Sequence, residues 1–486
     1  MSTVGAVLSC GVYIPRLRLP RARIAAETAW ANPPTRTAIP GARAICNWDE
    51  DALTLAVAAG RSCLAAAHGE AQGGAAHLDS LVLCSTTAPF ADRDDAVVLA
   101  TALDLPEDVA TLNVASSLRA ATGGLISAAR HAAADRTLLV ASDARQTRVG
   151  SAQELAYGDA AAAVLVGPAD SAALATVLAS QSIGSDFVDH YRMSGARFDY
   201  ALEERWVRDE MLMKAVPRAA AKLLAAAGCA AESVHHLAIP VGAGQARRIA
   251  AVCGLTAAQC DERVLAQCGD AGAAMPLLLL SAALEAAKPG ELIVLIGLGQ
   301  GVDALLLRAE AAVGNGRRPL TAALARQFEE TSYVRYLSHR GLVDADFGMR
   351  AERDQRTAHT VAYRKGGAIT AFHGGRCERC ATVQYPQSRV CVNPQCRATD
   401  TQVPYRLADS RGRVKSFTED WQAYAPRPPY IYGNIEFTEG GNLLMEATDV
   451  EAGELRVDDA VRFVFRIKDD DRMRGFRRYF WKATKA

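Results

Sequence analysis

Hydrophobic and polar positions alternate along the first 310 residues in a pattern that is typical of an α/β domain. Short apolar runs alternate with longer stretches whose apolar residues recur at helical spacing. This order favours helices packed on a central sheet. The runs with the length of buried strands include residues 81–85, 137–141, 160–166, 236–241, 292–297 and 304–307.

The order of these predicted elements occurs twice, which indicates an internal duplication. In each half a helix leads to a strand, a second helix, another strand and a glycine-containing turn into a third strand. The second helix of each half, from residue 117 and from residue 269, carries small residues on nearly all faces, as expected between two sheets. We therefore expect a duplicated five-layer αβαβα core, with halves at about 1–168 and 169–310, whose two central helices point their N-termini at one cleft.

The chain changes character after residue 310. Residues 311–368 are charged and aromatic, and we interpret them as a helical linker. Residues 369–402 carry four cysteines, and residues 403–486 read as short strands separated by glycine and proline turns, which suit a small all-β barrel. A charged helix predicted at 203–210 in the core is interpreted as a solvated or interface face.

Charge balance argues against a nucleic-acid partner. The 486 residues include 54 Lys and Arg against 54 Asp and Glu, and from residue 401 onward 15 basic residues stand against 14 acidic ones. No electropositive track for nucleic acid is expected from such numbers. With 50% hydrophobic and 22% charged residues, the chain can bury large cores, and wholesale disorder is excluded.

Two features argue against a membrane or secreted location. The N-terminal residues have no cationic lead-in before their apolar stretch, unlike a secretory signal. The most apolar segment, 271–287, contains Pro276 and Glu285 and is shorter than the roughly 18 to 20 clean residues of a membrane span. We expect a cytoplasmic protein.

The cysteines at 377, 380, 391 and 396 are the strongest chemical signal. Cys377 and Cys380 form one knuckle, and Cys391 and Cys396 form a second after a ten-residue spacer. Four thiolates from two knuckles can surround Zn²⁺ as a tetrahedron and leave no open position, so the predicted ion is structural. Disulfides or unliganded thiols are the alternatives, and the paired spacing in a reducing compartment favours zinc.

Five short segments carry a resemblance to a known family. They are residues 11–15, 49–54, 89–91, 158–162 and 299–301. Through them the chain up to residue 310 resembles the thiolase superfamily, in particular 3-hydroxy-3-methylglutaryl-CoA synthases and ketoacyl synthase III enzymes. The chain from about residue 370 resembles the zinc-ribbon plus OB-fold protein that often accompanies thiolases as a separate subunit. The resemblance implies a coenzyme A thioester as substrate, carbon-carbon bond chemistry and at least a homodimer.

The resemblance also implies an active site without the family's Cys, His and Glu. When the motifs are matched, the family's acid falls on Thr86, its cysteine on Leu118 and its histidine on Ala238. A one-residue slip would place Ser117 at the nucleophile position, but no histidine would activate its hydroxyl. The family's Asn on the second central helix becomes Asp270. A covalent acyl-enzyme by the family's route is therefore not expected.

Three side chains are candidates for catalysis: His190, Asp270 and Ser117. His190 lies among the polar and aromatic residues 189–192, which can orient and tune an imidazole as a general base. The alternative is a hydrogen-bonded loop histidine. Asp270 lies at a predicted helix N-terminus, where it would otherwise cap Ala273.

Three interpretations follow. In the first, which is our working hypothesis, the chain performs aldol, retro-aldol or Claisen-type chemistry on acyl-CoA thioesters within a complex that includes a thiolase. In the second, it is a non-catalytic scaffold or partner subunit of a thiolase or acyltransferase. In the third, the barrel binds nucleic acid or lipid and the core is a relic.

Overall fold

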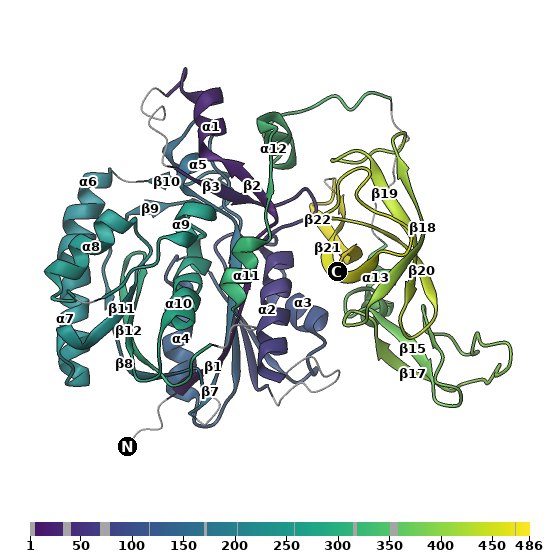
Figure 1. Cartoon of the computed structure of the whole chain (residues 1–486), viewed down its shortest axis with the longest axis horizontal. Helices are drawn as coiled ribbons and strands as arrows, with labels where there is room; N and C mark the ends of the chain where they lie inside the picture. Colours follow the sequence, from purple (N-terminus) through teal and green to yellow (C-terminus); the bar gives the residue numbers. More distant parts are fainter. Residues whose placement is uncertain are drawn as a thin grey trace. The chain divides into compact units, whose positions relative to one another are not determined.

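The computed structural model describes residues 5–32, 40–68, 78–115, 117–169, 173–201, 203–256, 258–313, 318–349, 358–471 and 473–486 (Figure 1). The chain divides into two compact units. The core unit lies within residues 1–47, 51–100 and 105–336, and the barrel unit within residues 48–50, 101–104 and 337–486. Among the residues described, no helix is long and apolar enough to cross a membrane.

Nine hydrogen-bonded strands form the centre of the core unit, in the order β11-β12-β13-β8-β1-β7-β6-β4-β5. In one half, β4 and β6 run parallel and are followed by antiparallel β7 and β1; in the other, β11 and β12 run parallel and are followed by antiparallel β13 and β8. This repeat confirms the predicted duplication. The strands are β1 (Gly5–Tyr13), β4 (Ser80–Cys84), β5 (Ala110–Val114), β6 (Thr137–Asp143), β7 (Ala160–Pro168), β8 (Ala175–Gly184), β11 (Val234–Ala238), β12 (Leu292–Leu298) and β13 (Gly301–Ala309).

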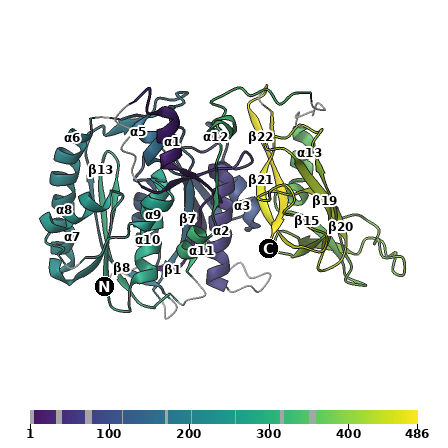
Figure 2. The same ribbon diagram turned by 45° about the horizontal axis from the view of Figure 1, so that its top comes forward.

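Three helical layers alternate with the two half-sheets (Figure 2). On one outer face, α2 (Ala52–His68) packs on β1, β6 and β7, and on the other, α7 (Val216–Ala227) packs on β8 and β13. Between the half-sheets lie α4 (Ala120–His131) and α10 (Met275–Ala286), which contact each other and both half-sheets. The predicted five-layer αβαβα core is confirmed.

Small residues allow the central helices to lie close to the sheets. A Cβ added to Gly124 in α4 would lie 2.8 Å from the Cδ1 atom of Leu139 on β6, closer than such atoms pack. Both central helices begin later than predicted. The α10 helix is preceded by a 3₁₀ turn at Gly272–Ala274, in which Gly272 has a φ of +58°, and Pro276 then occupies its first turn.

The segment predicted as charged and helical before α7 has an unusual form. A short α6 (Glu204–Trp206) leads into a π-helix at Val207–Ala215, which continues directly into α7. Stretches of π-helix are rare and often occur at functional sites. The remaining elements before the ribbon are β2 (Leu17–Pro20), α1 (Arg21–Thr28), β3 (Ala42–Ile45), α3 (Asp95–Leu103), α5 (Ala152–Ala156), β9 (His190–Tyr191), β10 (Tyr200–Ala201), α8 (Ala243–Val252), α9 (Arg263–Gln267), α11 (Pro319–Ala325), β14 (Phe328–Glu329) and α12 (Tyr333–His339).

The barrel unit combines a three-stranded ribbon with a five-stranded sheet in the order β20-β19-β18-β21-β22. An isolated bridge between Ala447 and Ala483 links the end of β20 to β22, and Phe372 and Trp481 stack in the core that the sheet encloses. Residues 314–317 and 350–357 of the predicted linker lie outside the described residues. The elements are α13 (His359–Arg364), α14 (Gly366–Ile369), β15 (His373–Cys377), β16 (Val383–Gln384), β17 (Gln402–Arg406), β18 (Gly412–Asp420), β19 (Tyr430–Phe437), β20 (Asn442–Glu446), β21 (Ala460–Asp471) and β22 (Phe476–Lys485).

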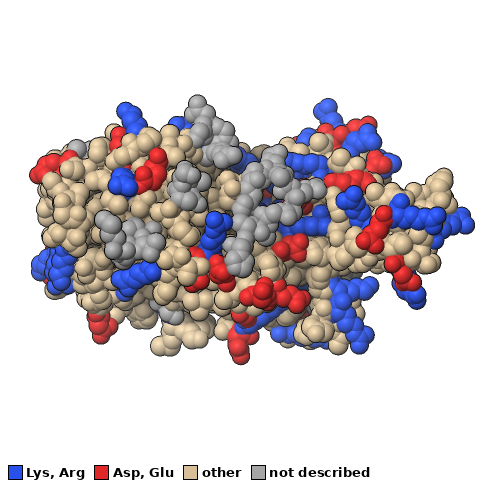
Figure 3. All heavy atoms as spheres, turned by 90° about the horizontal axis from the view of Figure 1, so that it is seen from below, with Lys and Arg blue, Asp and Glu red and all other residues tan. Residues whose placement is uncertain are grey.

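Five charged side chains are buried together in the barrel unit, and we call them the buried charge cluster: Asp49, Glu50, Glu446, Arg466 and Lys482. Nζ of Lys482 lies 3.0 Å from a carboxylate oxygen of Asp49 and 3.0 Å from one of Glu446. Nη2 of Arg466 lies 3.0 Å from Oε1 of Glu50. On the face shown in Figure 3, by contrast, basic and acidic side chains are interspersed at the surface.

Candidate functional site

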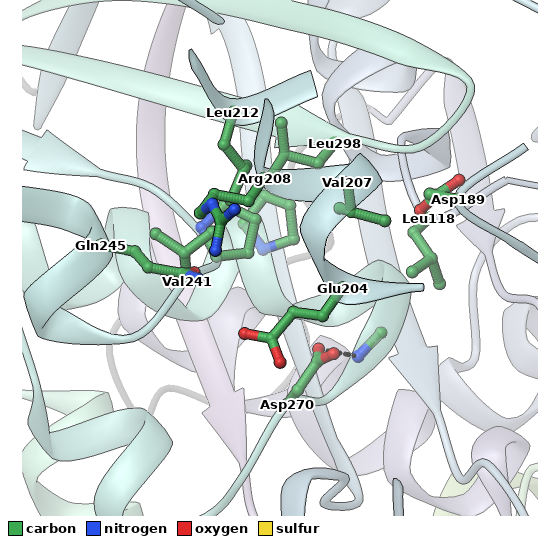
Figure 4. Close-up of a pocket in the computed structure, with 13 residues that line it drawn as sticks. Leu118, Asp189, Glu204, Val207, Arg208, Leu212, Val241, Gln245, Asp270 and Leu298 are labelled. Atoms are coloured by element: carbon green, nitrogen blue, oxygen red, sulfur yellow. Dashed lines mark hydrogen bonds between the residues drawn. The ribbon is translucent and has the colours of Figure 1, made fainter. Parts of the chain in front are cut away.

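A cavity of about 240 Å³ lies in the core unit. It is formed at the carboxyl ends of β11 and β12, beside the N-terminal ends of α4 and α10 and the π-helix. Its position agrees with the predicted central cleft. The side chains that line it are Leu118, Asp189, Glu204, Val207, Arg208, Leu212, Pro240, Val241, Gln245, Asp270, Gly272, Pro276 and Leu298 (Figure 4).

Leu118 and Ala238, which the sequence matches to the family's nucleophile and histidine, have only hydrocarbon side chains. Leu118 lines the cavity, and Ala238 is buried in the core at the end of β11. The Ser117 hydroxyl donates to the carbonyl of Gly299 over 3.3 Å and accepts from the Arg119 N–H over 3.1 Å. Ser117 is not among the lining residues, and its hydroxyl is engaged by the backbone.

No cysteine of the core contributes a thiol to the described lining of the cavity. Among the thirteen described residues that line the cavity there is no cysteine and no histidine. Burial raises the pKa of the Cys63 and Cys268 thiols to about 12. At neutral pH these thiols are protonated, and a thiol in this form is a poor nucleophile.

His190 is paired with a carboxylate that lines the cavity. Its Nδ1 atom lies 2.9 Å from Oδ2 of Asp189, and the Gln300 side-chain amide donates to Oδ1 of Asp189 over 3.0 Å. Burial raises the pKa of the Asp189 carboxyl, but the hydrogen bond and charge of His190 outweigh it and hold this pKa below its usual range. No described residue forms a hydrogen bond with Nε2 of His190. The arrangement can orient an imidazole for proton transfer.

Asp270 lines the cavity as half of an ion pair. Its Oδ2 atom lies 2.8 Å from Nη2 of Arg145, a buried guanidinium whose carbon lies 3.5 Å from the centre of the Tyr157 ring. Burial lowers the pKa of Arg145, but Asp270 and Tyr157 raise it above the usual value, so the guanidinium is charged. The Asp270 carboxylate is therefore held in place from one side and is open to the cavity on the other.

The alternative role predicted for Asp270, as the cap of Ala273, is wrong. Oδ1 of Asp270 accepts from the N–H of Gly272 over 2.9 Å, and the N–H of Ala273 donates instead to Oδ2 of Asp143 over 2.8 Å. The left-handed conformation of Gly272 turns the backbone toward the end of β6, where Asp143 lies. Asp143 thus occupies the capping position.

Asp143 is a functional-site neighbour that sequence reasoning missed. Its buried carboxylate accepts from the Thr86 N–H over 2.8 Å, from the Thr86 hydroxyl over 2.9 Å and from the Thr87 hydroxyl over 2.9 Å. Thr86, the position matched to the family's acid, is therefore engaged with Asp143. A signal that could have identified it is its place at the carboxyl end of a buried strand, two residues before Arg145.

The charged helix at 203–210 was interpreted as a solvated or interface face, and this interpretation is incomplete. Glu204 and Arg208 line the cavity, and in Figure 4 the Glu204 and Asp270 carboxylates lie at one end of the labelled group. Nε of Arg208 donates to Oδ1 of Asp209 over 2.8 Å. The π-helix places Arg208 and Leu212 on the cavity side together.

The four cysteines of the ribbon lie together in the barrel unit. The sulfur atoms of Cys377, Cys380, Cys391 and Cys396 all lie within 4.8 Å of one another. The Cys377–Cys396 and Cys380–Cys391 sulfur pairs are separated by 3.9 and 3.5 Å. Four sulfurs bound tetrahedrally to Zn²⁺ would be separated by about 3.8 Å, so the residues fit this ion.

Known proteins are similar to both units of this chain, the core unit and the barrel unit. Residues 405–466 match the family model of the ChsH2 C-terminal OB-fold domain. The chain is 26% identical over 341 residues to a hydroxymethylglutaryl-CoA synthase from Aeropyrum pernix, covering 68% of this chain and 92% of that protein. The structure of MvaS in complex with 3-hydroxy-3-methylglutaryl coenzyme A is 18% identical, with a TM-score of 0.60 and coverage of 73% and 98%.

A second solved structure points to the same fold. The 3-oxoacyl-(acyl carrier protein) synthase III of Pseudomonas aeruginosa PAO1 is 23% identical, with a TM-score of 0.53. The match covers 64% of this chain and 100% of the synthase. The chain thus joins a thiolase-like core, similar in sequence to hydroxymethylglutaryl-CoA synthases, to a C-terminal OB-fold domain of the ChsH2 type with a four-cysteine ribbon.

Proposed function

We propose that the core unit forms or cleaves a carbon-carbon bond in an acyl-CoA thioester without a covalent acyl-enzyme. The observation that carries this proposal is a cavity lined both by Leu118, which the sequence matches to the family's nucleophile, and by Asp189, which is paired with His190. The similarity to hydroxymethylglutaryl-CoA synthases supports the thioester as the substrate class. Aldol and retro-aldol steps need a base and an enolate stabiliser but no thiol.

His190 is the proposed base. His190 does not itself line the cavity, and with Nδ1 on Asp189 its Nε2 atom is the one that can accept a proton from the hydroxyl of a 3-hydroxyacyl thioester that extends past Asp189. As the proton leaves, the Cα–Cβ bond breaks, the oxygen becomes a carbonyl, and the electron pair moves onto the thioester as an enolate. Protonation at Cα then completes the cleavage, and the reverse sequence is the aldol addition. Asp189 itself is a weak base, because His190 lowers its pKa.

Two other groups support this chemistry. The N-terminal end of α4, which follows Leu118, brings the positive end of a helix dipole to the side of the cavity, where it would favour the negative charge of an enolate. Asp270, fixed by Arg145, can accept a hydrogen bond from a substrate hydroxyl and so orient it.

The test is to incubate the purified chain, alone and with a co-purified thiolase, with 3-hydroxyacyl-CoA thioesters. A shorter acyl-CoA and a free aldehyde or ketone, detected by mass spectrometry, are the expected products. The proposal would be rejected if neither preparation, the chain alone or the chain with the thiolase, released these two products.

The second candidate function is a non-catalytic partner of a thiolase. It is favoured by the loss of every matched nucleophile and base, since Leu118 and Ala238 are inert and Ser117 is held by the backbone. In that case removal of residues 370–486 should weaken association with the thiolase, and His190→Ala should change nothing.

We further propose a structural Zn²⁺ on the four ribbon cysteines and a homodimer. The zinc would supply the folding energy of a ribbon that has little hydrophobic core of its own. The dimer is supported by β5, an edge strand of the nine-stranded sheet whose Leu112 side chain is 56% exposed. Light scattering of the purified chain measures the oligomeric state.

A further inference from the structure

We propose that the cavity selects an uncharged acyl group and rejects one that ends in a carboxylate. The inference rests on the proposed function, because it takes the acyl group of a thioester to be what enters the cavity. It goes beyond that function by naming the class of acyl group.

The shape and lining of the cavity favour a small apolar group. Its volume of about 240 Å³ is below the range typical of drug-sized ligands. More than half of the lining residues are hydrophobic, and they are Leu118, Val207, Leu212, Pro240, Val241, Pro276 and Leu298. A short hydrocarbon chain gains free energy by leaving water for such a surface.

The charges in the lining are mostly negative. Three carboxylates, of Asp189, Glu204 and Asp270, line the cavity with one cation, Arg208. Asp270 is neutralised by Arg145 from behind, and Asp189 is paired with His190. Glu204 forms no salt bridge with any residue that the structure describes. Glu204 is exposed to solvent, so its charge acts on whatever occupies the cavity but is partly screened by water.

The single cation of the lining is already engaged. Arg208 is paired with the adjacent Asp209 at 2.8 Å, and this carboxylate and Glu204 both raise the pKa of Arg208. An acyl group that ends in a carboxylate would thus meet Glu204, and it could bind Arg208 only by sharing this guanidinium with Asp209. Like charges at close range repel, and water around the exposed Glu204 weakens this repulsion without removing it. We expect discrimination of about tenfold in affinity, a magnitude typical of one partly solvated charge pair.

The experiment compares two thioesters of equal chain length. Pentanoyl-CoA and glutaryl-CoA differ only in the terminal carboxylate, and coenzyme A alone measures the contribution of the carrier. Their dissociation constants are determined by titration calorimetry with the full chain and with two variants, Glu204→Gln and Glu203→Gln. The second variant is the matched control, because Glu203 is the adjacent exposed carboxylate, pairs with Arg205 and does not line the cavity.

The inference predicts that pentanoyl-CoA binds about tenfold more tightly than glutaryl-CoA, and that Glu204→Gln removes most of this difference while Glu203→Gln leaves it unchanged. Equal affinities, or a difference that survives Glu204→Gln, would overturn the inference and leave the proposed function intact. If neither thioester binds more tightly than coenzyme A, the proposed function fails and the inference fails with it.

Discussion

Asp189 and His190 are adjacent in the chain, yet only the carboxylate lines the cavity, and the imidazole is joined to it by a 2.9 Å contact from Nδ1. The pairing assigns the two side chains different tasks. The carboxylate fixes the imidazole orientation, and the imidazole is left to exchange the proton.

The first prediction concerns this imidazole. Replacing His190 by Ala should lower the turnover of a 3-hydroxyacyl-CoA by on the order of 100-fold, the usual contribution of a positioned general base, while its dissociation constant changes little. Steady-state kinetics and calorimetry separate the two effects. His131→Ala, which alters an exposed histidine on α4, is the control. Equal loss in both variants, or none in either, would contradict the role of His190.

The second prediction is that acetyl-CoA leaves no covalent adduct. Leu118 and Ala238 offer no nucleophile or base, and the Ser117 hydroxyl is bound to the backbone. Intact-mass measurement after incubation should show the unmodified chain. A double variant, Leu118→Cys with Ala238→His, serves as the comparison in which an acetyl increment becomes possible. An acetyl group found on Ser117 of the unaltered protein would show that the motif matching is wrong.

The third prediction concerns the ribbon. Elemental analysis should find close to one Zn²⁺ per chain, since the four ribbon sulfurs fit one tetrahedral ion. Removal of the metal by a chelator, or Cys380→Ser, should unfold the ribbon and leave the core unit folded. Cys229→Ser, which changes a partly exposed cysteine of the core, should do neither. Zinc content near zero in protein purified without chelator would refute the site.

The fourth prediction concerns the buried charge cluster. Lys482→Met should destabilise the barrel unit by up to about 3 to 5 kcal/mol, because it removes the buried ammonium that Asp49 and Glu446 share and leaves them, among the described residues, only the cations Arg466 at 3.9 Å and Lys468, respectively. Lys415→Met removes a half-exposed partner of Glu436 on the same sheet and should have a much smaller effect. Denaturant unfolding curves measure both. Comparable losses would indicate that burial of the cluster is unimportant for stability.

The fifth prediction is a pH dependence. Burial raises the pKa of Glu446, but Lys482 and Lys468 outweigh it and hold this pKa well below the usual value. A lowered native pKa stabilises the protein above the unfolded pKa, about 4.3 for glutamate, and this contribution is lost as the pH falls toward the native value. The stability difference between the unaltered chain and Glu446→Gln should therefore be constant above about pH 5.5 and shrink below pH 4. A difference that grows on acidification would contradict this assignment.

The regular parts of the molecule could be predicted because their signals are local. Alternating apolar runs identify the strands of both halves, and the spacing of four cysteines identifies the ribbon without knowledge of the rest of the fold. The small residues of α4, such as Gly124, correctly placed this helix between two sheets, although one stripe of it, which includes Ser127 and His131, is exposed.

The site was harder to predict because its contacts join distant segments. Asp143 binds Thr86 and Ala273, which lie 57 and 130 residues away, and although its place at the end of a buried strand is a local signal, no local pattern identifies these partners. The π-helix could not be predicted from the sequence either, because its wider turn depends on packing rather than on residue preference. Glu204 and Arg208 therefore read as a solvated face although they line the cavity.

Residues 48–50 belong to the barrel unit although the chain on both sides of them belongs to the core unit. The Lys482 ammonium lies 4.1 Å from the centre of the Trp48 ring, and the Ile467 N–H donates to the Asp49 carbonyl over 2.9 Å. If the gene were divided at the linker, the first polypeptide would keep Trp48, Asp49 and Glu50. These side chains would then lack the barrel residues that they contact in the full chain. Residues 101–104 also belong to the barrel unit, so an attempt to express the two units as separate chains has to redesign both short segments.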